Sequence, residues 1–208
     1  MTAPLVAVLD YGIGNLRSAQ KALIRVGADA HLTSDPGLIA DAAGVVLPGV
    51  GAFGACTKAL HGSGLADLAQ RAAASGRPFV GICVGMQLLY EASEESPGVD
   101  GLGILEGRVR LLPDGVKRPQ MQWNRLELVQ PHHPSVEGLG DPWLYFVHSY
   151  AAPNDPSYTV ATVDYGGAVT AVVAKDNVWA TQCHPEKSSA AGLALLENWV
   201  RTCSEGEQ

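Results

Sequence analysis

The sequence has 208 residues, of which 47% are hydrophobic and 17% are charged. This fits one globular domain, or at most two small ones, and argues against a disordered chain. Its formal net charge is −7 and no segment is rich in lysine or arginine, so we expect no nucleic-acid partner. The first apolar run, residues 5–9, is too short for a signal peptide, and no stretch approaches the ~18 apolar residues of a membrane-spanning helix. The absence of such a stretch predicts no membrane partner. The cysteines form no C-x-x-C pair, which favours free thiols in a reducing cytoplasm.

Strand and helix patterns alternate in the first half of the chain. Short apolar runs predict strands at residues 5–9, 30–33, 44–47 and 78–82. Helical patterns are expected from about residue 15, at 38–42, around 65–72 and from residue 86 to 90. Asn15 can cap the first helix, and Gly27 and Gly76 suit helix ends. This alternation predicts a doubly wound, flavodoxin-like parallel sheet with helices on both faces.

The second half is rich in strand patterns and has little helix between them. We expect strands at residues 109–112, 125–129, 143–147, 159–163, 168–174 and 178–183, and a last helix at 190–202. This half therefore predicts antiparallel or mixed strands that extend or cover the first sheet. The whole chain, residues 1–208, is expected to form one α/β domain with a mostly parallel central sheet.

A candidate nucleophile lies where a buried strand meets a helix. Residues 81–85 read G-I-C-V-G, which has the form of a nucleophile elbow with Cys83 in place of serine. The turn exposes the thiol at the carboxyl edge of the sheet, and the helix N-terminus favours the reactive thiolate. The amide of Val84 would then face a developing oxyanion. A buried structural cysteine between packing glycines is the alternative interpretation.

A candidate base and its orienting carboxylate follow the last predicted strand. His184 and Glu186 are two residues apart, so extended backbone places both side chains on one face. The carboxylate can fix one imidazole tautomer and leave the other ring nitrogen to face Cys83. A surface histidine beside a surface glutamate is the alternative. A zinc site at His132 and His133 lacks an obvious third ligand, so no metal is expected.

A glycine-rich loop follows the third predicted strand. Residues 47–54 read L-P-G-V-G-A-F-G, and glycines at 49, 51 and 54 let backbone amides approach a ligand closely. A phosphate-binding loop is an alternative, but no G-K-[ST] follows and the loop comes after the third strand, not the first. A second oxyanion donor fits the loop better.

Together these segments resemble a known family along almost the whole chain. The sequence is similar to the glutaminase subunits of imidazole glycerol phosphate synthase, which are class I (triad) glutamine amidotransferases of histidine biosynthesis. The segments that carry the resemblance are DYGIGNL (10–16), LPGVGAFG (47–54), GICVGMQ (81–87), YFVHSY (145–150) and QCHPEKS (182–188). The triad alone specifies only the amidotransferase class, whereas DYGIGNL, PGVGAFG and FVHSY point to this subfamily and to its fold.

The resemblance implies a role for each matching residue. Cys83 would attack the side-chain amide of glutamine, His184 would transfer protons, and Glu186 would orient His184. Oxyanion amides would come from Val84 and the loop at residues 48–51, chiefly Val50 and Gly51, and in relatives that loop is thought to rearrange before it can donate. The glutamine α-amino and α-carboxylate groups would be surrounded by a further set: Gly49, Gln87, Glu91, Ser149 and Tyr150. No cofactor is implied.

The family's partner is a separate TIM-barrel cyclase subunit that receives ammonia through a tunnel and yields imidazole glycerol phosphate and an aminoimidazole carboxamide ribotide. Asn15, Trp123 and Lys187 lie in motifs that resemble the subunit interface of this heterodimer. One segment departs from the family, in which it reads close to His-Met-Gly-Trp-Asn. Here residues 120–124 read Gln-Met-Gln-Trp-Asn, and the glutamine at 122 removes a permissive backbone position, so the local turn is expected to differ.

Two other functions remain open at this point. The same triad serves the glutaminases of pyridoxal phosphate and anthranilate synthesis, which feed different acceptor enzymes. A non-catalytic or thiol-sensing protein of the same fold is the second alternative, because fold alone does not settle function. The presence of His184 and Glu186 together with Cys83 argues against the second.

Overall fold

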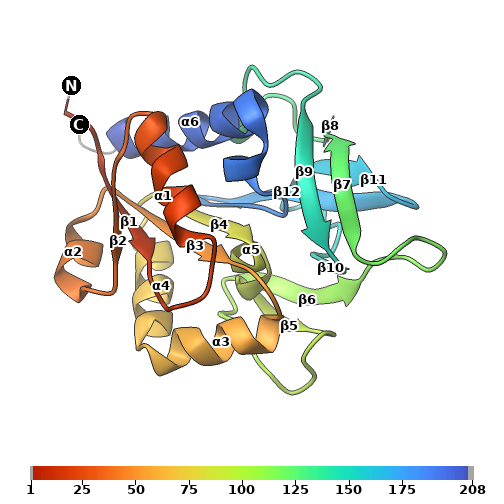
Figure 1. The fold of residues 1–208 in the computed structure, drawn as a ribbon, viewed down its shortest axis with the longest axis horizontal. Coiled ribbons are helices and arrows are strands. Elements are labelled where there is room, and N and C mark those ends of the chain that lie inside the picture. Colours follow the sequence, from red (N-terminus) through yellow and green to blue (C-terminus); the bar gives the residue numbers. More distant parts are fainter. Residues whose placement is uncertain (1, 206–208) are drawn as a thin grey trace.

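The computed structural model describes residues 2–205 and has an eight-stranded sheet at its centre (Figure 1). The strand order is β2-β1-β3-β4-β13-β12-β11-β8, and the first five strands run parallel. The remaining three pair antiparallel. The strands are β1 (Leu5–Leu9), β2 (Asp29–Thr33), β3 (Gly44–Gly49), β4 (Phe79–Cys83), β8 (Glu127–Leu128), β11 (Thr159–Asp164), β12 (Ala168–Lys175) and β13 (Val178–Thr181). The expected mixed α/β sheet is confirmed.

Helices lie on both sides of this sheet, with α1 and α6 above it and α3 and α4 below it in Figure 1. The strands between these layers are buried on both faces; β3 and β4 have no exposed residue. That explains why they read as continuous apolar runs. The helices are α1 (Leu16–Arg25), α2 (Pro36–Asp41), α3 (Phe53–Gly62), α4 (Leu65–Ala74), α5 (Val84–Leu88) and α6 (Ser189–Glu205). Within residues 2–205 no helix is long and apolar enough to cross a membrane.

Two small sheets stand beside the main one. The first joins β5 (Tyr90–Ser93), β6 (Leu105–Leu111) and β10 (Tyr150–Ala151). The second pairs β7 (Gln120–Arg125) with β9 (Trp143–His148) in an antiparallel ribbon at the right of Figure 1. Short 3-10 turns, η1 (Pro134–Val136) and η2 (Pro185–Lys187), complete the described chain.

Four local expectations were wrong. Asn15 makes no side-chain cap at α1; its side-chain NH2 group donates to Glu186 across the site. The helix after Cys83 ends at Leu88, and Tyr90 opens strand β5. The strand expected at 125–129 is divided between β7 and β8, which belong to different sheets. Helix α3 was not expected; it packs Phe53, Cys56 and Leu60 into the core.

The helix ends and the departing segment 120–124 have simple physical explanations. Gly27 and Gly76, the glycines expected to end helices, both have positive φ (+98° and +80°), a conformation that glycine adopts without strain. Gln122 lies opposite Phe146 in the regular β7–β9 pairing, so this position is extended strand and needs no glycine.

Candidate active site

Strand β4 delivers Cys83 to the carboxyl edge of the parallel sheet, and the chain then turns directly into α5. Cys83 has φ +56°, which is a strained value for a residue other than glycine. Gly49 and Gly85 make the turn possible, because a Cβ on Gly49 would lie 2.6 Å from the amide nitrogen of Gly85. The predicted nucleophile elbow is therefore present in the backbone. Since α5 has only five residues, its dipole adds little to thiolate stability.

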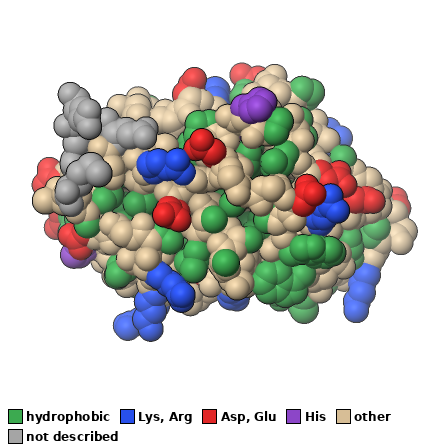
Figure 2. Space-filling view, turned by 90° about the horizontal axis from the view of Figure 1, so that it is seen from above, with side chains coloured by type: hydrophobic (Ala, Val, Ile, Leu, Met, Phe, Trp, Pro, Cys, Tyr) green, Lys and Arg blue, Asp and Glu red, His purple; other side chains and the backbone are tan. Residues whose placement is uncertain are grey.

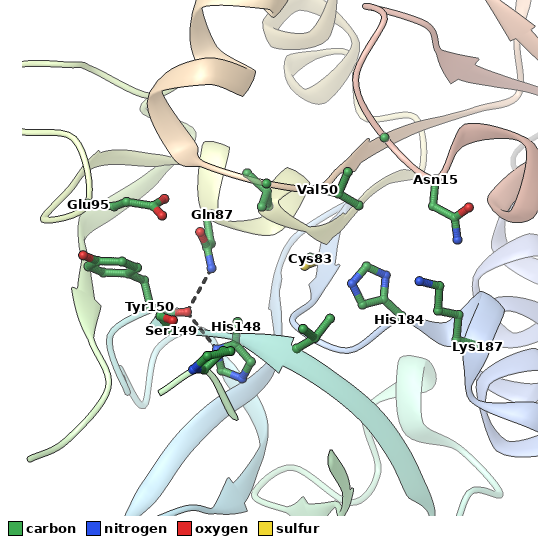
Figure 3. A pocket seen from close by; sticks show the side chains of 15 residues that line it. Asn15, Val50, Cys83, Gln87, Glu95, His148, Ser149, Tyr150, His184 and Lys187 are labelled. Carbon is green, nitrogen blue, oxygen red and sulfur yellow. Dashed lines mark hydrogen bonds between the residues drawn. The ribbon is translucent and has the colours of Figure 1, made fainter. Parts of the chain in front are cut away.

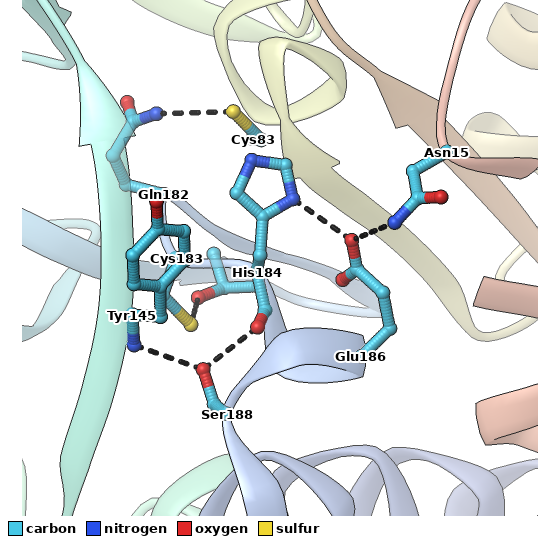
Figure 4. Close-up of polar contacts among 9 residues, drawn as sticks. Asn15, Cys83, Tyr145, Gln182, Cys183, His184, Glu186 and Ser188 are labelled. Atoms are coloured by element: carbon cyan, nitrogen blue, oxygen red, sulfur yellow. Dashed lines mark hydrogen bonds and ion pairs between the residues drawn. The ribbon is translucent and has the colours of Figure 1, made fainter. Parts of the chain in front are cut away.

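His184 and Glu186 form a buried pair beside Cys83. The Nδ1 of His184 lies 2.9 Å from a Glu186 carboxylate oxygen, and the two side chains are 3% and 1% exposed. Asn15 donates to the same Glu186 oxygen at 3.0 Å. Figure 4 shows the other ring nitrogen of His184 turned toward Cys83. The structure thus brings together the three residues of the predicted triad, and Asn15 orients the carboxylate.

The protonation of the pair follows from its contacts. Burial alone would lower the pKa of His184, but bonding to Cys83 and Glu186 outweighs it and raises that pKa to about 9. Burial would raise the pKa of Glu186, yet hydrogen bonds from His184 and Asn15 keep it below its usual value. The geometry therefore favours an imidazolium held against a carboxylate, which is the ion pair that proton transfer from a thiol produces.

The backbone of His184 is fixed by a residue that sequence reasoning missed. The hydroxyl of Ser188 donates to the carbonyl of His184 at 2.7 Å and accepts the amide of Tyr145 at 2.9 Å. The amide of His184 donates to the Tyr145 carbonyl at 3.0 Å. These bonds tie the histidine to strand β9 (Figure 4). Ser188 lies in the recognised segment QCHPEKS, but its spacing from His184 assigned it no role.

Cys83 and His184 open into a cavity of about 590 Å³, within the usual range for small-molecule sites. Figure 3 shows Glu95, Gln87, Tyr150 and Ser149 on one side of Cys83, and Asn15, His184 and Lys187 on the other. Predicted residues that line this cavity are Asn15, Val50, Gly51, Cys83, Val84, Gln87, Ser149, Tyr150, His184 and Lys187.

Glu91 and Gly49 do not line the cavity. The carboxylate of Glu91 accepts the amide of Gly107 on the surface. Because the helix ends at Leu88, the chain passes through β5 and brings Glu95 to the cavity instead. Glu95 accepts the amide of Phe53 at 2.7 Å. Gly49 serves close packing under the elbow and makes no contact with the cavity.

The wall opposite the triad is a hydrogen-bonded set. The side-chain amide of Gln87 donates to the carbonyl of Tyr150 at 2.9 Å and to Gln182 at 3.0 Å. Gln182 in turn directs its amide at the sulfur of Cys83, 3.8 Å away. His148 donates from Nδ1 to the Tyr150 carbonyl at 2.8 Å, and burial lowers the pKa of His148 to about 4, so it is neutral. Gln182 and His148 were missed because their roles depend on tertiary contacts.

Trp123 lies on the outer surface of the β7–β9 ribbon and is 45% exposed. Its ring centroid lies 6.1 Å from that of Tyr145 on the neighbouring strand. Met121 on the same strand is 62% exposed. Figure 2 shows hydrophobic side chains gathered over this side of the molecule. Trp123 does not reach the cavity.

A strained cysteine at a strand-to-helix turn, beside a buried histidine–glutamate pair, is the site expected of a class I glutamine amidotransferase. The family model described as "Glutamine amidotransferase class-I" matches residues 7–203. The chain is 50% identical over 204 residues to the imidazole glycerol phosphate synthase subunit HisH of Synechococcus elongatus, covering 96% of this chain and 94% of that protein. It is 47% identical to HisH of Methanothermobacter thermautotrophicus, covering 94% and 98%.

The chain belongs to the class-I glutamine amidotransferase family and, within it, to the HisH subunits of imidazole glycerol phosphate synthase. Two solved structures share the fold. One is described as "Crystal structure of glutamine amidotransferase", with a TM-score of 0.76 at 22% identity, covering 96% of this chain and 99% of that chain. PurLQS from Thermotoga maritima has a TM-score of 0.72 at 17% identity, covering 100% of each.

Proposed function

We propose that this chain is the glutaminase subunit of imidazole glycerol phosphate synthase and hydrolyses glutamine to glutamate and ammonia with Cys83, His184 and Glu186. The observation that carries this proposal is the buried His184–Glu186 pair, whose free ring nitrogen faces a thiol held at φ +56°. A thiol in that position has a base, and the base has an orienting carboxylate.

The reaction divides into two half-reactions. The thiol proton of Cys83 passes to His184, which gives the imidazolium described above, and the sulfur then bonds to the amide carbon of glutamine. The tetrahedral intermediate expels the amine, which leaves as ammonia with the proton from His184, and a thioester remains. His184 then takes a proton from water, whose oxygen attacks the thioester. Glutamate departs and the proton returns to the sulfur.

Charge that develops on the substrate oxygen needs donors at the elbow. The amide of Val84 follows the nucleophile directly, and Val50 and Gly51 line the same cavity from the opposite loop. Gln87, Ser149, Tyr150 and Glu95 lie on the far side of Cys83 (Figure 3), where the glutamine α-groups would fit. Within this set, Glu95 supplies the negative charge that an α-ammonium requires.

The ammonia acceptor is proposed to be the TIM-barrel cyclase subunit, which binds as a heterodimer and makes imidazole glycerol phosphate and aminoimidazole carboxamide ribotide in the cytoplasm. Support comes from the exposed Met121 and Trp123. Met121 is paired with Val147, which lines the cavity together with Asn15 and Lys187. Exposed aromatic residues of this kind anchor protein interfaces.

The test is to mix the chain with a cyclase subunit of the same pathway and follow glutamate release. Release should be strong only with the cyclase and its nucleotide ligand present, and should vanish in Cys83→Ala. A Cys83→Ala protein that retains glutamine-dependent activity would overturn the assigned nucleophile.

A further inference from the structure

The sulfur of Cys83 has a second polar neighbour besides His184. The side-chain amide nitrogen of Gln182 lies 3.8 Å from this sulfur, and Gln182 is 0% exposed. Figure 4 shows Gln182 and His184 approaching Cys83 from different directions. Gln182 does not line the cavity, so it meets the reacting centre only through the sulfur. The half-reactions described above give this buried amide no task.

The backbone holds Gln182 beside the nucleophile. Gln182 follows β13 directly, and its main-chain N–H donates to the carbonyl of Ala171 in β12 at 2.8 Å. Strand β13 is paired in parallel with β4, and Thr181 lies opposite Ile82, the residue before Cys83. Two neighbouring strand ends therefore present the amide and the thiol next to each other.

The orientation of the Gln182 amide follows from a chain of hydrogen bonds that begins at a backbone carbonyl. The carbonyl of Tyr150 can only accept, so the Gln87 group that lies 2.9 Å from it is the NH2 group. This NH2 group also donates to Gln182 at 3.0 Å, so its partner there is the Gln182 oxygen. The other end of the Gln182 amide is then its NH2 group, which faces the sulfur of Cys83.

A donor in this position gains strength once the thiol proton has passed to His184. The sulfur then carries a negative charge, and a hydrogen bond to a charged acceptor is stronger than one to a neutral acceptor. Burial strengthens the interaction further, because the surroundings screen charge weakly. The contact of 3.8 Å is long, as catalytic hydrogen bonds often are before substrate binds. The amide therefore favours the thiolate–imidazolium pair over the neutral thiol and imidazole.

We propose that Gln182 is a further catalytic residue: its side-chain NH2 group donates to the sulfur of Cys83 and stabilises the thiolate that attacks the substrate. This inference rests on the proposed glutaminase function and adds one residue to it. Gln87 orients the donor, because it holds the oxygen of the Gln182 amide. The same bonds join the sulfur to the Tyr150 carbonyl in the cavity wall.

The other titratable groups around the sulfur keep their charge near neutral pH. Three of them stay protonated because burial raises their pKa values: Tyr11, Cys56 and Cys183. Burial lowers the pKa of His148 to about 4, so His148 stays neutral. Glu95 and Lys187 line the same cavity as charged groups, and Glu186 is paired with His184. A pH profile of sulfur reactivity between these limits therefore reports on Cys83 and His184.

The first test measures alkylation of Cys83 by iodoacetamide against pH in the chain alone, with the modified cysteine identified by peptide mass spectrometry. The thiolate is the form that reacts. In Gln182→Leu the pH of half-maximal rate should rise by about one unit, which is a tenfold loss of thiolate below that pH. Gln182→Met serves in its place if Gln182→Leu does not fold.

Gln130→Leu is the matched control for this substitution. Gln130 is a half-buried glutamine whose side-chain amide donates to the carbonyl of Thr159 at 3.0 Å. It does not line the cavity and makes no contact with the sulfur. Its alkylation profile should match that of wild type.

The second test measures kcat for glutamate release with the cyclase and its nucleotide ligand present. Gln182→Leu should lower kcat about tenfold at neutral pH, in proportion to the lost thiolate. The deficit should shrink as the pH rises, because a higher pH restores the thiolate that the amide no longer stabilises. A purely structural role would lower kcat by the same factor at every pH. KM for glutamine should change less than kcat, because Gln182 does not line the cavity.

A third measurement needs no substitution of Gln182. In NMR spectra of the wild-type chain, the side-chain NH2 resonances of Gln182 should shift with pH at the midpoint of the alkylation profile. In Cys83→Ala the shift at that midpoint should be absent, because the sulfur that accepts the bond is gone.

Four outcomes would overturn the inference. These are an unchanged alkylation profile in folded Gln182→Leu, an equal change in Gln130→Leu, a loss of kcat that is the same at every pH, or Gln182 resonances that do not move at the alkylation midpoint. Wild type that releases no glutamate in any mixture would refute the glutaminase proposal instead. The alkylation profiles would then still decide whether Gln182 acts on the sulfur.

Discussion

His184 lies between a thiol and a carboxylate, and its side chain is only 3% exposed. Its Nδ1 is bonded to Glu186, and Asn15 completes the bonding of the same carboxylate oxygen. A second buried histidine, His148, has its Nδ1 bonded to a neutral carbonyl. Two histidines near one cavity thus receive opposite electrostatic environments, and their proton occupancy should differ accordingly.

The two imidazoles are expected to titrate far apart. The pKa of His184 is about 9 and that of His148 is about 4, so at pH 7 the first is protonated and the second is neutral. Glu186→Gln removes a charge that favours the imidazolium, so the pKa of His184 should fall. NMR titration of the ring resonances measures both values. A His184 that is neutral at pH 7 in wild type would contradict this electrostatic account.

Glu95 and Glu91 offer a matched pair of carboxylates. Glu95 lines the cavity, whereas Glu91 accepts an amide on the surface. Glu95→Gln keeps a hydrogen-bond acceptor for Phe53 but loses the charge, so kcat/KM for glutamine should fall about 10- to 100-fold, as expected for a lost charged hydrogen bond of ~1.5–3 kcal/mol. Glu91→Gln should match wild type. Steady-state kinetics of the complete mixture measure kcat/KM for both variants. A loss confined to Glu91→Gln would support the prediction from sequence that Glu91 contacts glutamine.

At the scale of single residues, local spacing was enough to predict which side chains lie together at the elbow. The G-x-C-x-G turn and the H-x-E spacing depend on backbone geometry over a few residues. The structure has the predicted turn at Cys83 and the predicted pair of His184 and Glu186 beside it. Glu95 was missed because its position depends on where α5 stops, which tertiary packing decides. Gln182 and Ser188 act across long separations that leave no local pattern.

Among the elements, β3, β4 and α5 meet at a junction whose backbone is too closely packed to hold an added side chain at Gly49. A Cβ on Gly49 would meet the amide of Gly85 at 2.6 Å and the side chain of Val84 at 3.0 Å. These neighbours are mostly backbone, so they cannot move without displacing the elbow. The site therefore depends on how closely two strand ends approach.

Gly49→Ala should lower both stability and turnover. Overpacking of this kind typically costs about 1–3 kcal/mol, and displacement of the elbow should reduce kcat as well. Gly62→Ala is the control, because Gly62 lies near the end of α3 with open space around it and should be neutral or stabilised by up to about 1 kcal/mol. Thermal unfolding and glutamate release measure the two effects. Equal melting temperatures for Gly49→Ala and wild type would contradict the packing account.

Most of the strands were predictable because burial on both faces produces apolar runs. Helix α3 was not, since its segment begins with a glycine-rich loop and contains a further glycine at position 54. Its stability comes from Phe53 and Leu60 in the core, each of which contributes about 1.5–3 kcal/mol on burial. The division of residues 120–128 between two sheets likewise follows from pairing partners far along the chain.

On the scale of the whole molecule, the cavity and the exposed side of the β7–β9 ribbon lie close together. Val147 near the end of β9 and Ser149 just after it line the cavity, and Trp123 lies on the adjacent strand. A partner that covers the ribbon would therefore also reach the mouth of the cavity. This arrangement suits transfer of ammonia without release to water.

Trp123→Ala should weaken binding to the cyclase subunit without unfolding the chain. An interface tryptophan typically contributes 2 kcal/mol or more, so Kd should rise at least about 30-fold. Ile24→Ala is the control, because Ile24 is also an exposed apolar residue (51%) but lies in α1 outside the cavity and the ribbon. Calorimetric titration with the cyclase measures both, and equal affinities for the two variants would place the interface elsewhere.

The most direct test of the whole account is glutamate release from glutamine by the wild-type chain, mixed with the cyclase subunit and its nucleotide ligand, beside the same mixture containing Cys83→Ala. The account predicts rapid release by wild type in the full mixture, little by the wild-type chain alone, and none with Cys83→Ala. Equal release with and without Cys83, or none from folded wild type in any mixture, would contradict it.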